Sequence, residues 1–343
     1  MRQFIEKVEQ GRHLSFEEME QAANRLFKED TPSDDIKAFL MALAKKGESA
    51  QEVAALATVM KSFALPIHTE KASYMDNCGT GGDGTNTFNI STAASFVLAG
   101  AGVKLAKHGN RKISSAAGSS DVLEALGIRL DFSREELAYL LEKEGLAFIF
   151  APHVHPKMKR IGVIRREIGK PTIFNLVGPL TNPLKLSSQF TGISRKNFTM
   201  EYASVLSMLG RERAIVVSGA GGMDEASLAG QNVFVLVEKG DLIPFTLTPD
   251  DVGLKTAPIS AIRGGDAVEN AKTIRAILQG QRGPHFDTVV FNAGIALFAD
   301  GQAETIQEGV KKATESILSG RALKKLEAIV AFSERTREEG MLA

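Results

Sequence analysis

The feature that most constrains the fold is a change of sequence pattern close to residue 71. Residues 1–65 carry helical patterns only, whereas beyond residue 71 short apolar runs alternate with helical patterns. The strand-like runs are 102–109, 146–152, 213–219, 233–240 and 287–298, and helix candidates include 91–102, 133–145, 198–210, 303–320 and 322–340. This alternation predicts an α/β fold with a central, mostly parallel sheet covered by helices.

The first 70 residues predict a small all-helical domain. Ser15 with Glu18, and Ser49 with Glu52, have the spacing of a capping box. Between them, residues 33–47 carry acidic residues in the first turn and lysines in the last, which suits the helix dipole. We therefore expect a helical N-terminal domain over 1–70 and a large α/β domain over 71–164 and 188–343.

Composition excludes several classes of protein. Lys plus Arg equals Asp plus Glu, at 41 each, which argues against a general binder of nucleic acid or of membrane surfaces. The single cysteine, Cys78, excludes an intrachain disulfide and a multi-cysteine metal site, and it fits a reducing cytoplasm. Because we also find neither a signal-peptide pattern nor an apolar run near the ~20 residues of a membrane span, we predict a cytoplasmic location.

The stretch NCGTGGDGTNTFNIST, residues 77–92, has glycines at GxGxxG spacing: Gly79, Gly81 and Gly84. A dinucleotide site also needs a buried strand before the glycines and a ribose-binding carboxylate about 20 residues later. The preceding residues 73–78 are a poor buried strand, and no Asp or Glu occurs from Gly84 to Ser120. These observations disfavour a dinucleotide site.

The same stretch could bind a different phosphate. Closely spaced glycines let consecutive amides turn toward one anion, and a helix that starts near Asn89, Ser91 or Thr92 adds a second anion-binding end. Two such ends a few residues apart suit a pyrophosphate. The plainer interpretation, a mobile glycine turn followed by an ordinary helix cap, stays open on these residues alone.

A basic stretch follows the glycines. Lys104, Lys107, Arg111 and Lys112 occur in a segment that has no carboxylate, and the segment begins where a predicted strand ends. Ligands of open α/β sheets bind at that end of the strands. The alternative is a solvated basic loop.

An acidic pair appears in a later glycine-rich loop. Asp224 and Glu225 follow the predicted strand 213–219. In a loop both side chains can face one hard cation, and Mg²⁺ typically takes one or two carboxylates plus substrate phosphates. A solvated pair is the alternative.

Residues 150–183 hold a third polar cluster. His153 and His155 could ligate a metal, but the flanking prolines indicate a loop, so we favour a role in shaping a pocket. Arg165 and Arg166 lie in a helical context. One of them could bind a carboxylate bidentately, or both could form surface salt bridges with residues such as Glu167.

Four ordered segments together resemble the anthranilate phosphoribosyltransferases, over nearly the whole chain. They are GTGGDGTNTFNIST, KHGNRKISSAAGSSD, RREIGKPTIFNLVGPLTNP and GMDEAS. The resemblance implies transfer of the phosphoribosyl group of phosphoribosyl pyrophosphate (PRPP) to anthranilate, the second step from chorismate in tryptophan biosynthesis. It also implies a homodimer formed through the helical domain, and a return of residues 165–187 to that domain. The pyrimidine-nucleoside phosphorylases share the fold and are the nearest alternative.

The resemblance also assigns roles to matching residues, with Lys107 and Arg165 as catalytic residues. Ser91, Asp224 and Glu225 should reach two Mg²⁺ ions per subunit. Anthranilate should contact Gly79, Asn110 and Arg165, with His108, His155 and Pro179 along its path. PRPP should bind Gly79, Gly82, Asp83, Thr87, Asn89, Ile90, Ser91, Thr92, Lys107, His108, Gly109, Asn110, Arg111, Lys112, Ile113, Ser114, Ser115 and Ser119.

Four residues depart from the family pattern. Ser120, Lys157, Met223 and Ala226 stand where other residues are usual. None of them removes a polar group that has an assigned role. They leave open the affinity and the shape of the anthranilate tunnel.

Overall fold

The computed structural model describes residues 1–70, 73–110 and 117–341. Its strands are β1 (Tyr74–Asp76), β2 (Leu105–Gly109), β3 (Leu146–Phe150), β4 (Leu186–Gly192), β5 (Arg213–Ser218), β6 (Asn232–Glu238) and β7 (Asp241–Leu247). Its helices are α1 (Arg2–Glu9), α2 (Phe16–Leu26), α3 (Ser33–Lys46), α4 (Ala50–Ser62), α5 (Ile90–Gly100), α6 (Ser119–Ala125), α7 (Arg134–Lys143), α8 (Ala151–Val154), α9 (Met158–Ile168), α10 (Phe174–Val177), α11 (Thr199–Met208), α12 (Ala267–Leu278), α13 (Pro284–Ala299), α14 (Ile306–Leu318) and α15 (Arg321–Met341).

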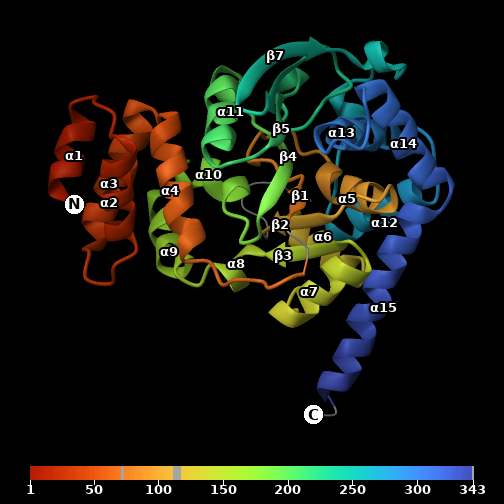
Figure 1. The fold of residues 1–343 in the computed structure, drawn as a ribbon, viewed down its shortest axis with the longest axis horizontal. Coiled ribbons are helices and arrows are strands. Elements are labelled where there is room, and N and C mark those ends of the chain that lie inside the picture. The colour runs from red at the N-terminus through yellow and green to blue at the C-terminus, as the bar shows by residue number, and fades with distance from the viewer. Residues whose placement is uncertain (71–72, 111–116, 342–343) are drawn as a thin grey trace.

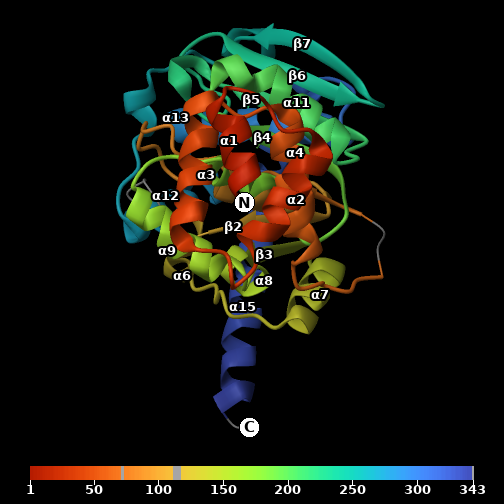
Figure 2. The ribbon, with the colours of Figure 1, turned by 90° about the vertical axis from the view of Figure 1, so that its left-hand side faces the viewer.

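The N-terminal helices form a bundle at one side of the molecule (Figures 1 and 2). Both predicted capping boxes are confirmed. The Ser15 hydroxyl accepts from the Glu18 amide at 3.2 Å, and the Ser49 hydroxyl accepts from the Glu52 amide at 3.3 Å. Each cap satisfies an amide that a helix start leaves without an intrahelical partner. The bundle and the sheet together confirm the predicted fold class.

Seven strands form one sheet in the described part of the chain, in the order β3-β2-β1-β4-β5-β6-β7. The pairs from β3 to β5 are parallel, and β6 and β7 add antiparallel strands at one edge. From β1 the chain first builds outward to β2 and β3, and then returns to place β4 on the other side of β1. This reversal makes the carboxyl ends of β1 and β4 the switch point outside which open α/β sheets bind ligands. We call the region outside these ends, where the loops after β1, β4 and β5 meet, the crevice between β1 and β4.

Two apolar cores hold the molecule together. The larger core joins the sheet to α5, α13 and α14, and the smaller core runs from the helical bundle through α9, α10 and α11 to β5 and β6. Ile164 of α9, Phe174 of α10 and Leu180 pack into the smaller core beside bundle residues such as Phe39 and Leu56. A segment distant in sequence therefore contributes to the helical side of the molecule.

Two sequence interpretations were wrong. Residues 287–298, read as strand-like, belong to α13, which is buried on nearly every side. A helix buried all round loses the polar face that gives the period of 3.6, so its pattern resembles that of a buried strand. Residues 74–76, read as part of a poor strand, form the buried strand β1 inside the sheet. The sequence did not reveal it, because three residues are too few to show the alternation of a strand.

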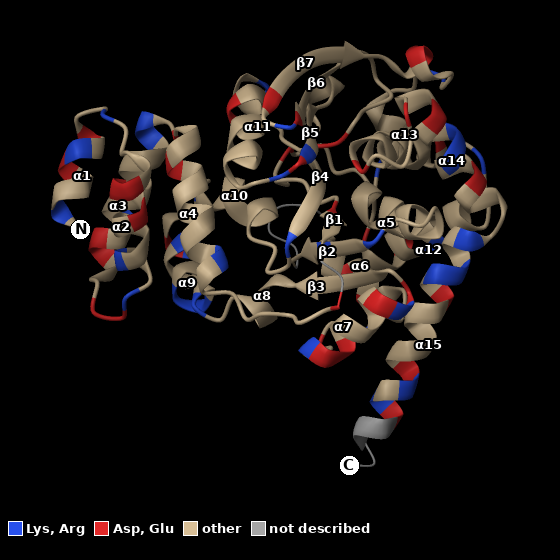
Figure 3. Ribbon diagram, viewed as in Figure 1, with Lys and Arg blue, Asp and Glu red and all other residues tan. Residues whose placement is uncertain are grey.

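Charged residues of both signs alternate along the outer helices, including the projecting α15 (Figure 3). In the described ranges we find no helix whose length and apolar character would allow it to cross a bilayer.

Candidate active site

Three loops meet at the crevice between β1 and β4. The glycine loop after β1 touches the end of β4, where the Thr80 amide donates to the Gly192 carbonyl at 3.0 Å. It also touches the acidic loop after β5, where the Gly81 amide donates to Asp224 Oδ2 at 2.5 Å. A Cβ on Gly79 would lie 2.8 Å from that same carboxylate oxygen, so only glycine fits there without a shift.

The acidic residues gather in this crevice. The Asp224 amide donates to Asp83 Oδ2 at 3.4 Å, and the Ser91 side chain lies close enough to Glu225 to lower its pKa slightly, against the larger effect of burial. Burial, followed by the Asp83 charge, raises the pKa of Asp224. Burial, followed by the Asp224 charge, raises the pKa of Glu225. The carboxylates thus repel one another in a partly desolvated place, where a bound cation would stabilise them.

The acidic loop has oxygen ligands that suit Mg²⁺, which prefers carboxylates and phosphates. Within the described ranges, no group of three or more His, Cys, Asp or Glu side chains is placed to hold a metal ion. Asp224 and Glu225 are therefore suited to a cation that takes its remaining ligands from a bound phosphate and from water.

Lys107 lies on β2, beneath the glycine loop. Its side chain is 2% exposed, and its amine donates to the Asn77 carbonyl at 3.2 Å and to Asn77 Oδ1 at 3.3 Å. Its charge lowers the pKa of Glu225, against the larger effect of burial. The structure thus brings the Lys107 amine close enough to Asp224 and Glu225 for their charges to interact.

The start of α5 borders the crevice. Of the three candidate cap residues, Asn89, Ser91 and Thr92, Asn89 occupies the N-cap position, but its side chain makes no capping bond. The side-chain Nδ2 of Asn89 instead donates to the Ala117 carbonyl at 3.2 Å, and its Oδ1 accepts from the side-chain Nδ2 of Asn270 at 2.9 Å. The buried Thr92 hydroxyl has no hydrogen-bond partner among the described residues. Ile90 is buried in the larger core.

The rest of the glycine loop is more open. Gly82 is exposed and has a φ of 80°, a conformation that favours glycine. Thr87 forms an isolated antiparallel bridge with Arg263. The loop is therefore held near α5 by this bridge, whereas Gly82 is open to solvent.

The segment after β2 carries the predicted phosphoribosyl-binding residues. Gly109 approaches Ser119 closely, since a Cβ there would lie 2.9 Å from the hydroxyl oxygen, and Ser119 donates to the Asn110 carbonyl at 3.1 Å. Lys107, Gly109, Ser119 and Ser120 line a pocket together with apolar side chains. The predictions for Arg111, Lys112, Ile113, Ser114 and Ser115 lie outside the described residues.

His108 and His155 face each other beside this segment, with ring centroids 5.2 Å apart. Burial lowers the pKa of His108 to about 3 and that of His155 to about 4, so both rings are neutral near pH 7. His108 Nδ1 lies 3.2 Å from the Gly178 carbonyl. Pro152 lies in the short helix α8 rather than in the expected loop.

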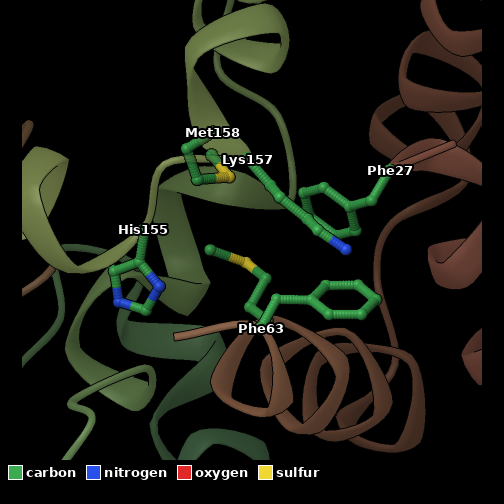
Figure 4. A pocket seen from close by; sticks show the side chains of 6 residues that line it. Phe27, Phe63, His155, Lys157 and Met158 are labelled. Atoms are coloured by element: carbon green, nitrogen blue, oxygen red, sulfur yellow. The ribbon is translucent and has the colours of Figure 1, made fainter. Parts of the chain in front are cut away.

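Lys157, one of the departures from the family pattern, lies next to His155. Its amine is 3.5 Å from the centroid of the Phe63 ring, and Figure 4 shows it between the rings of Phe27 and Phe63. These side chains line a small pocket with His155, Met60 and Met158. The other departures are buried: Ser120 in the first turn of α6, and Met223 and Ala226 on either side of the acidic pair in the sequence.

Arg165 lies on α9, as the helical pattern predicts. Its guanidinium donates to Asn175 Oδ1 at 3.1 Å and lies 5.7 Å from the centroid of the Phe174 ring. Burial lowers its pKa. The neighbouring Glu167 pairs with Lys37 of α3 at 2.6 Å.

Pro179 is buried, and its carbonyl accepts from Gln189 Nε2 at 2.7 Å. Sequence reasoning missed Gln189 and three other buried polar residues around the site: Asp76, Asn77 and Asn182. Asn182 donates to Asp76 Oδ2 at 2.9 Å and to the Ala106 carbonyl at 2.8 Å, which ties the segment after Pro179 to β1 and β2. The only signal in the sequence was a set of polar residues in or beside apolar runs.

The comparisons with known proteins agree with this geometry. A family model described as "Glycosyl transferase family, helical bundle domain" matches residues 2–64, and one described as "Glycosyl transferase family, a/b domain" matches residues 71–323. The chain is 56% identical over 335 residues to an anthranilate phosphoribosyltransferase of Exiguobacterium sibiricum, which covers 98% of this chain and 99% of the relative.

Solved structures of the same kind superpose closely. That of anthranilate phosphoribosyltransferase from Thermus thermophilus has a TM-score of 0.91 at 39% identity, and covers 96% of this chain and 99% of that one. That of the Saccharomyces cerevisiae enzyme in complex with PRPP and Mg has a TM-score of 0.84 at 28% identity, with 93% and 92% covered. These matches favour the transferase over the nucleoside phosphorylase alternative. The chain belongs to the anthranilate phosphoribosyltransferases, the glycosyltransferases that transfer the phosphoribosyl group of PRPP to anthranilate in tryptophan biosynthesis.

Proposed function

We propose that the crevice between β1 and β4 is where this chain binds the diphosphate of PRPP. The observation that carries the proposal is the meeting of three features there: the amides of Gly79–Asp83, the buried amine of Lys107, and the acidic pair Asp224 and Glu225. Amides and an ammonium attract a diphosphate directly, whereas carboxylates would repel it unless a cation lies between them.

The acidic pair is therefore assigned to Mg²⁺. Asp224, Glu225 and the Ser91 hydroxyl would hold two ions per subunit, and the diphosphate supplies further ligands. The raised pKa of both carboxyls supports this, because it reflects negative charge that burial leaves unscreened. The yeast relative solved with PRPP and Mg is consistent with it. Bound Mg²⁺ would neutralise the charge that develops on the departing diphosphate.

The phosphoribosyl half would lie along the segment that starts at β2 and reaches α6. Thr87 and residues 89–92 would border it on one side, and His108–Asn110 with Ser119 would border it on the other; contacts of Thr87, Asn89 and Ser119 with neighbouring residues hold these segments in place. Residues 111–115 are assigned to the same half from the family pattern alone.

Anthranilate would approach past Arg165, His155 and Pro179. A guanidinium can bind the anthranilate carboxylate bidentately, which orients the amine. The neutral rings of His108 and His155 offer an uncharged wall to an aromatic substrate. Gly79 and Asn110 would contact anthranilate where it meets the sugar.

In the reaction the anthranilate amine attacks the anomeric carbon and the diphosphate leaves. The chain's own contribution is electrostatic and positional. Lys107 and the loop amides stabilise the oxygens that gain charge, and loss of one such donor typically costs about 10²–10³ in rate. Arg165 keeps the amine in line for attack. The amine is neutral and nucleophilic at pH 7, so proton removal can follow the attack.

We also propose a homodimer formed through the helical domain, with residues 165–187 belonging to that domain. Exposed apolar side chains at Met41 of α3 and Val163 of α9 support the interface. The packing of Phe174 and Leu180 against the bundle supports the domain assignment. Sedimentation should give the dimer mass. The cytoplasmic location stays a prediction from composition.

The test of the proposed function is a fluorescence assay that follows the loss of anthranilate in the presence of PRPP and Mg²⁺. We expect turnover that stops when a chelator is added and returns with Mg²⁺. Phosphate-dependent cleavage of thymidine or uridine without use of anthranilate would support the phosphorylase instead.

A further inference from the structure

We propose that Asn77 is a positioning residue, which fixes the amine of Lys107 relative to the first turn of α5. The inference deepens the proposed function and depends on it, since Lys107 and Ser91 are the groups that Asn77 connects. Asn77 follows β1 directly and is 3% exposed.

Asn77 bonds to Lys107 through two different oxygens. Its backbone carbonyl accepts from the amine at 3.2 Å, and its side-chain Oδ1 accepts at 3.3 Å. A lysine ammonium has three N–H donors, so these two bonds orient the ammonium and leave one donor for a substrate. The buried stem of Lys107 restricts the amine further.

The same side chain holds α5. Its Nδ2 donates to the Ser91 carbonyl at 2.9 Å, and its Oδ1 also accepts from the Ser95 hydroxyl at 3.1 Å. The same Ser95 hydroxyl lies 2.7 Å from the Ser91 carbonyl, and its single proton can be donated to either acceptor. One buried amide therefore links a residue of β2 to the helix start that carries the proposed metal ligand Ser91.

The chemistry of these partners requires an amide. One end of the side chain must accept from a cation and a hydroxyl, and the other end must donate to a carbonyl. An aspartate would place an acceptor against the Ser91 carbonyl and would add a negative charge beside Lys107. Alanine would leave the carbonyl of Ser91 and the amine of Lys107 each short of one bond.

The experiment is a double-mutant cycle on Asn77→Ala and Lys107→Ala, read as kcat and KM for each substrate. A misplacement of about 1 Å can cost about 10² in rate, so we expect Asn77→Ala to lower kcat/KM for PRPP by up to about 10²-fold. The KM for anthranilate should not change. Because Asn77 would act through Lys107, the double variant should be little worse than Lys107→Ala alone.

Two further variants separate positioning from loss of stability. Ser316→Ala removes a buried hydroxyl that donates to the Val97 carbonyl at 2.8 Å, on the other half of α5. It should lower the melting temperature and leave both KM values unchanged. Asn77→Asp preserves the shape and should impair use of PRPP at least as much as Asn77→Ala. Ser95→Ala, a milder change to the same network, should give a smaller loss of the same kind.

Three results would overturn the inference. The first is additive losses in the cycle, and the second is wild-type kinetics in Asn77→Asp. The third is a fall in kcat for the Asn77 variants that is fully accounted for by a smaller folded fraction, measured by circular dichroism at the assay temperature. If Lys107→Ala itself keeps both the wild-type kcat and the wild-type KM for PRPP, the placement of PRPP against Lys107 fails too. If Lys107→Ala is impaired and Asn77→Ala is not, only the role of Asn77 fails.

Discussion

Gly192→Ala should displace the acidic pair without removing any of its ligand atoms. Gly192 is the last residue of β4, and a Cβ there would lie 1.6 Å from the Asp224 carbonyl oxygen and 2.2 Å from its carbon. Real Cβ atoms essentially never approach closer than 3.0 Å, so the Asp224 carbonyl must retreat by about 1.4 Å. It cannot retreat freely, because a Cβ on Gly219 would lie only 2.0 Å from the Glu225 carbonyl, which shows how tightly this loop packs.

Two magnitudes follow from that displacement. Overpacking of this kind typically costs about 1–3 kcal/mol of stability, so the melting temperature should fall. A shift of more than 1 Å in the proposed metal ligands should lower kcat/KM for PRPP by about 10²-fold and raise the Mg²⁺ concentration needed for half-maximal rate.

The assay is anthranilate fluorescence over a series of Mg²⁺ concentrations, alongside a thermal melt. Gly162→Ala is the matched control: its Cβ would have its nearest neighbour, Arg166, at 3.9 Å, and α9 accepts alanine readily. We expect wild-type kinetics from it. A folded Gly192→Ala protein with wild-type kcat/KM and wild-type Mg²⁺ dependence would refute the reasoning.

Three other predictions follow from the same site. Asp224→Asn combined with Glu225→Gln should abolish Mg²⁺-dependent turnover while the fold survives; unchanged rates would remove the metal assignment. Arg165→Ala should mainly raise the KM for anthranilate. Arg165→Lys should show nearly the same raised KM, because a lysine cannot bind a carboxylate bidentately. A change confined to the KM for PRPP would show that the anthranilate and PRPP sites are assigned the wrong way round. The folded pKa values of His108 and His155, about 3 and about 4, lie below the ordinary 6.5, so the unfolded chain takes up these two protons first and the pair lowers stability as the pH drops from about 6.5 to about 4. The raised pKa values of Asp76, Asp224 and Glu225 act in the opposite direction, so the readout is the difference between two proteins. In denaturant melts His108→Gln should gain stability relative to the wild type as the pH falls across this range; a constant difference between the two would contradict the assignment.

Local sequence rules predicted the elements whose signals are local. The capping boxes at Ser15 and Ser49 form as expected, since each depends on residues three apart. The strands β2, β3, β5 and β6 occur where apolar runs are flanked by turn residues. The helix α13 was misread because burial on all sides removes the polar face, and β1 because three residues carry no periodicity.

The residues of the site also fall into those with a local sequence signal and those without one. The glycine loop, the basic segment and the acidic pair were each visible as residue patterns, but only the sheet order shows why Gly81 meets Asp224, 143 residues later. Asn77, Asn182 and Gln189 could not be singled out, because a buried amide looks like any surface amide until its partners are known. Their value lies in tertiary hydrogen bonds, which no local spacing encodes.

The central claim is that main-chain amides, Lys107 and the acidic pair enclose the diphosphate together. The most direct measurement is a crystal structure of the protein grown with PRPP and Mg²⁺. The account predicts phosphate oxygens within hydrogen-bonding distance of the Gly79–Asp83 amides and of Lys107 Nζ, with metal density between the phosphates and Asp224 and Glu225. Density for PRPP elsewhere, or a diphosphate that touches neither the loop nor Lys107, would contradict it.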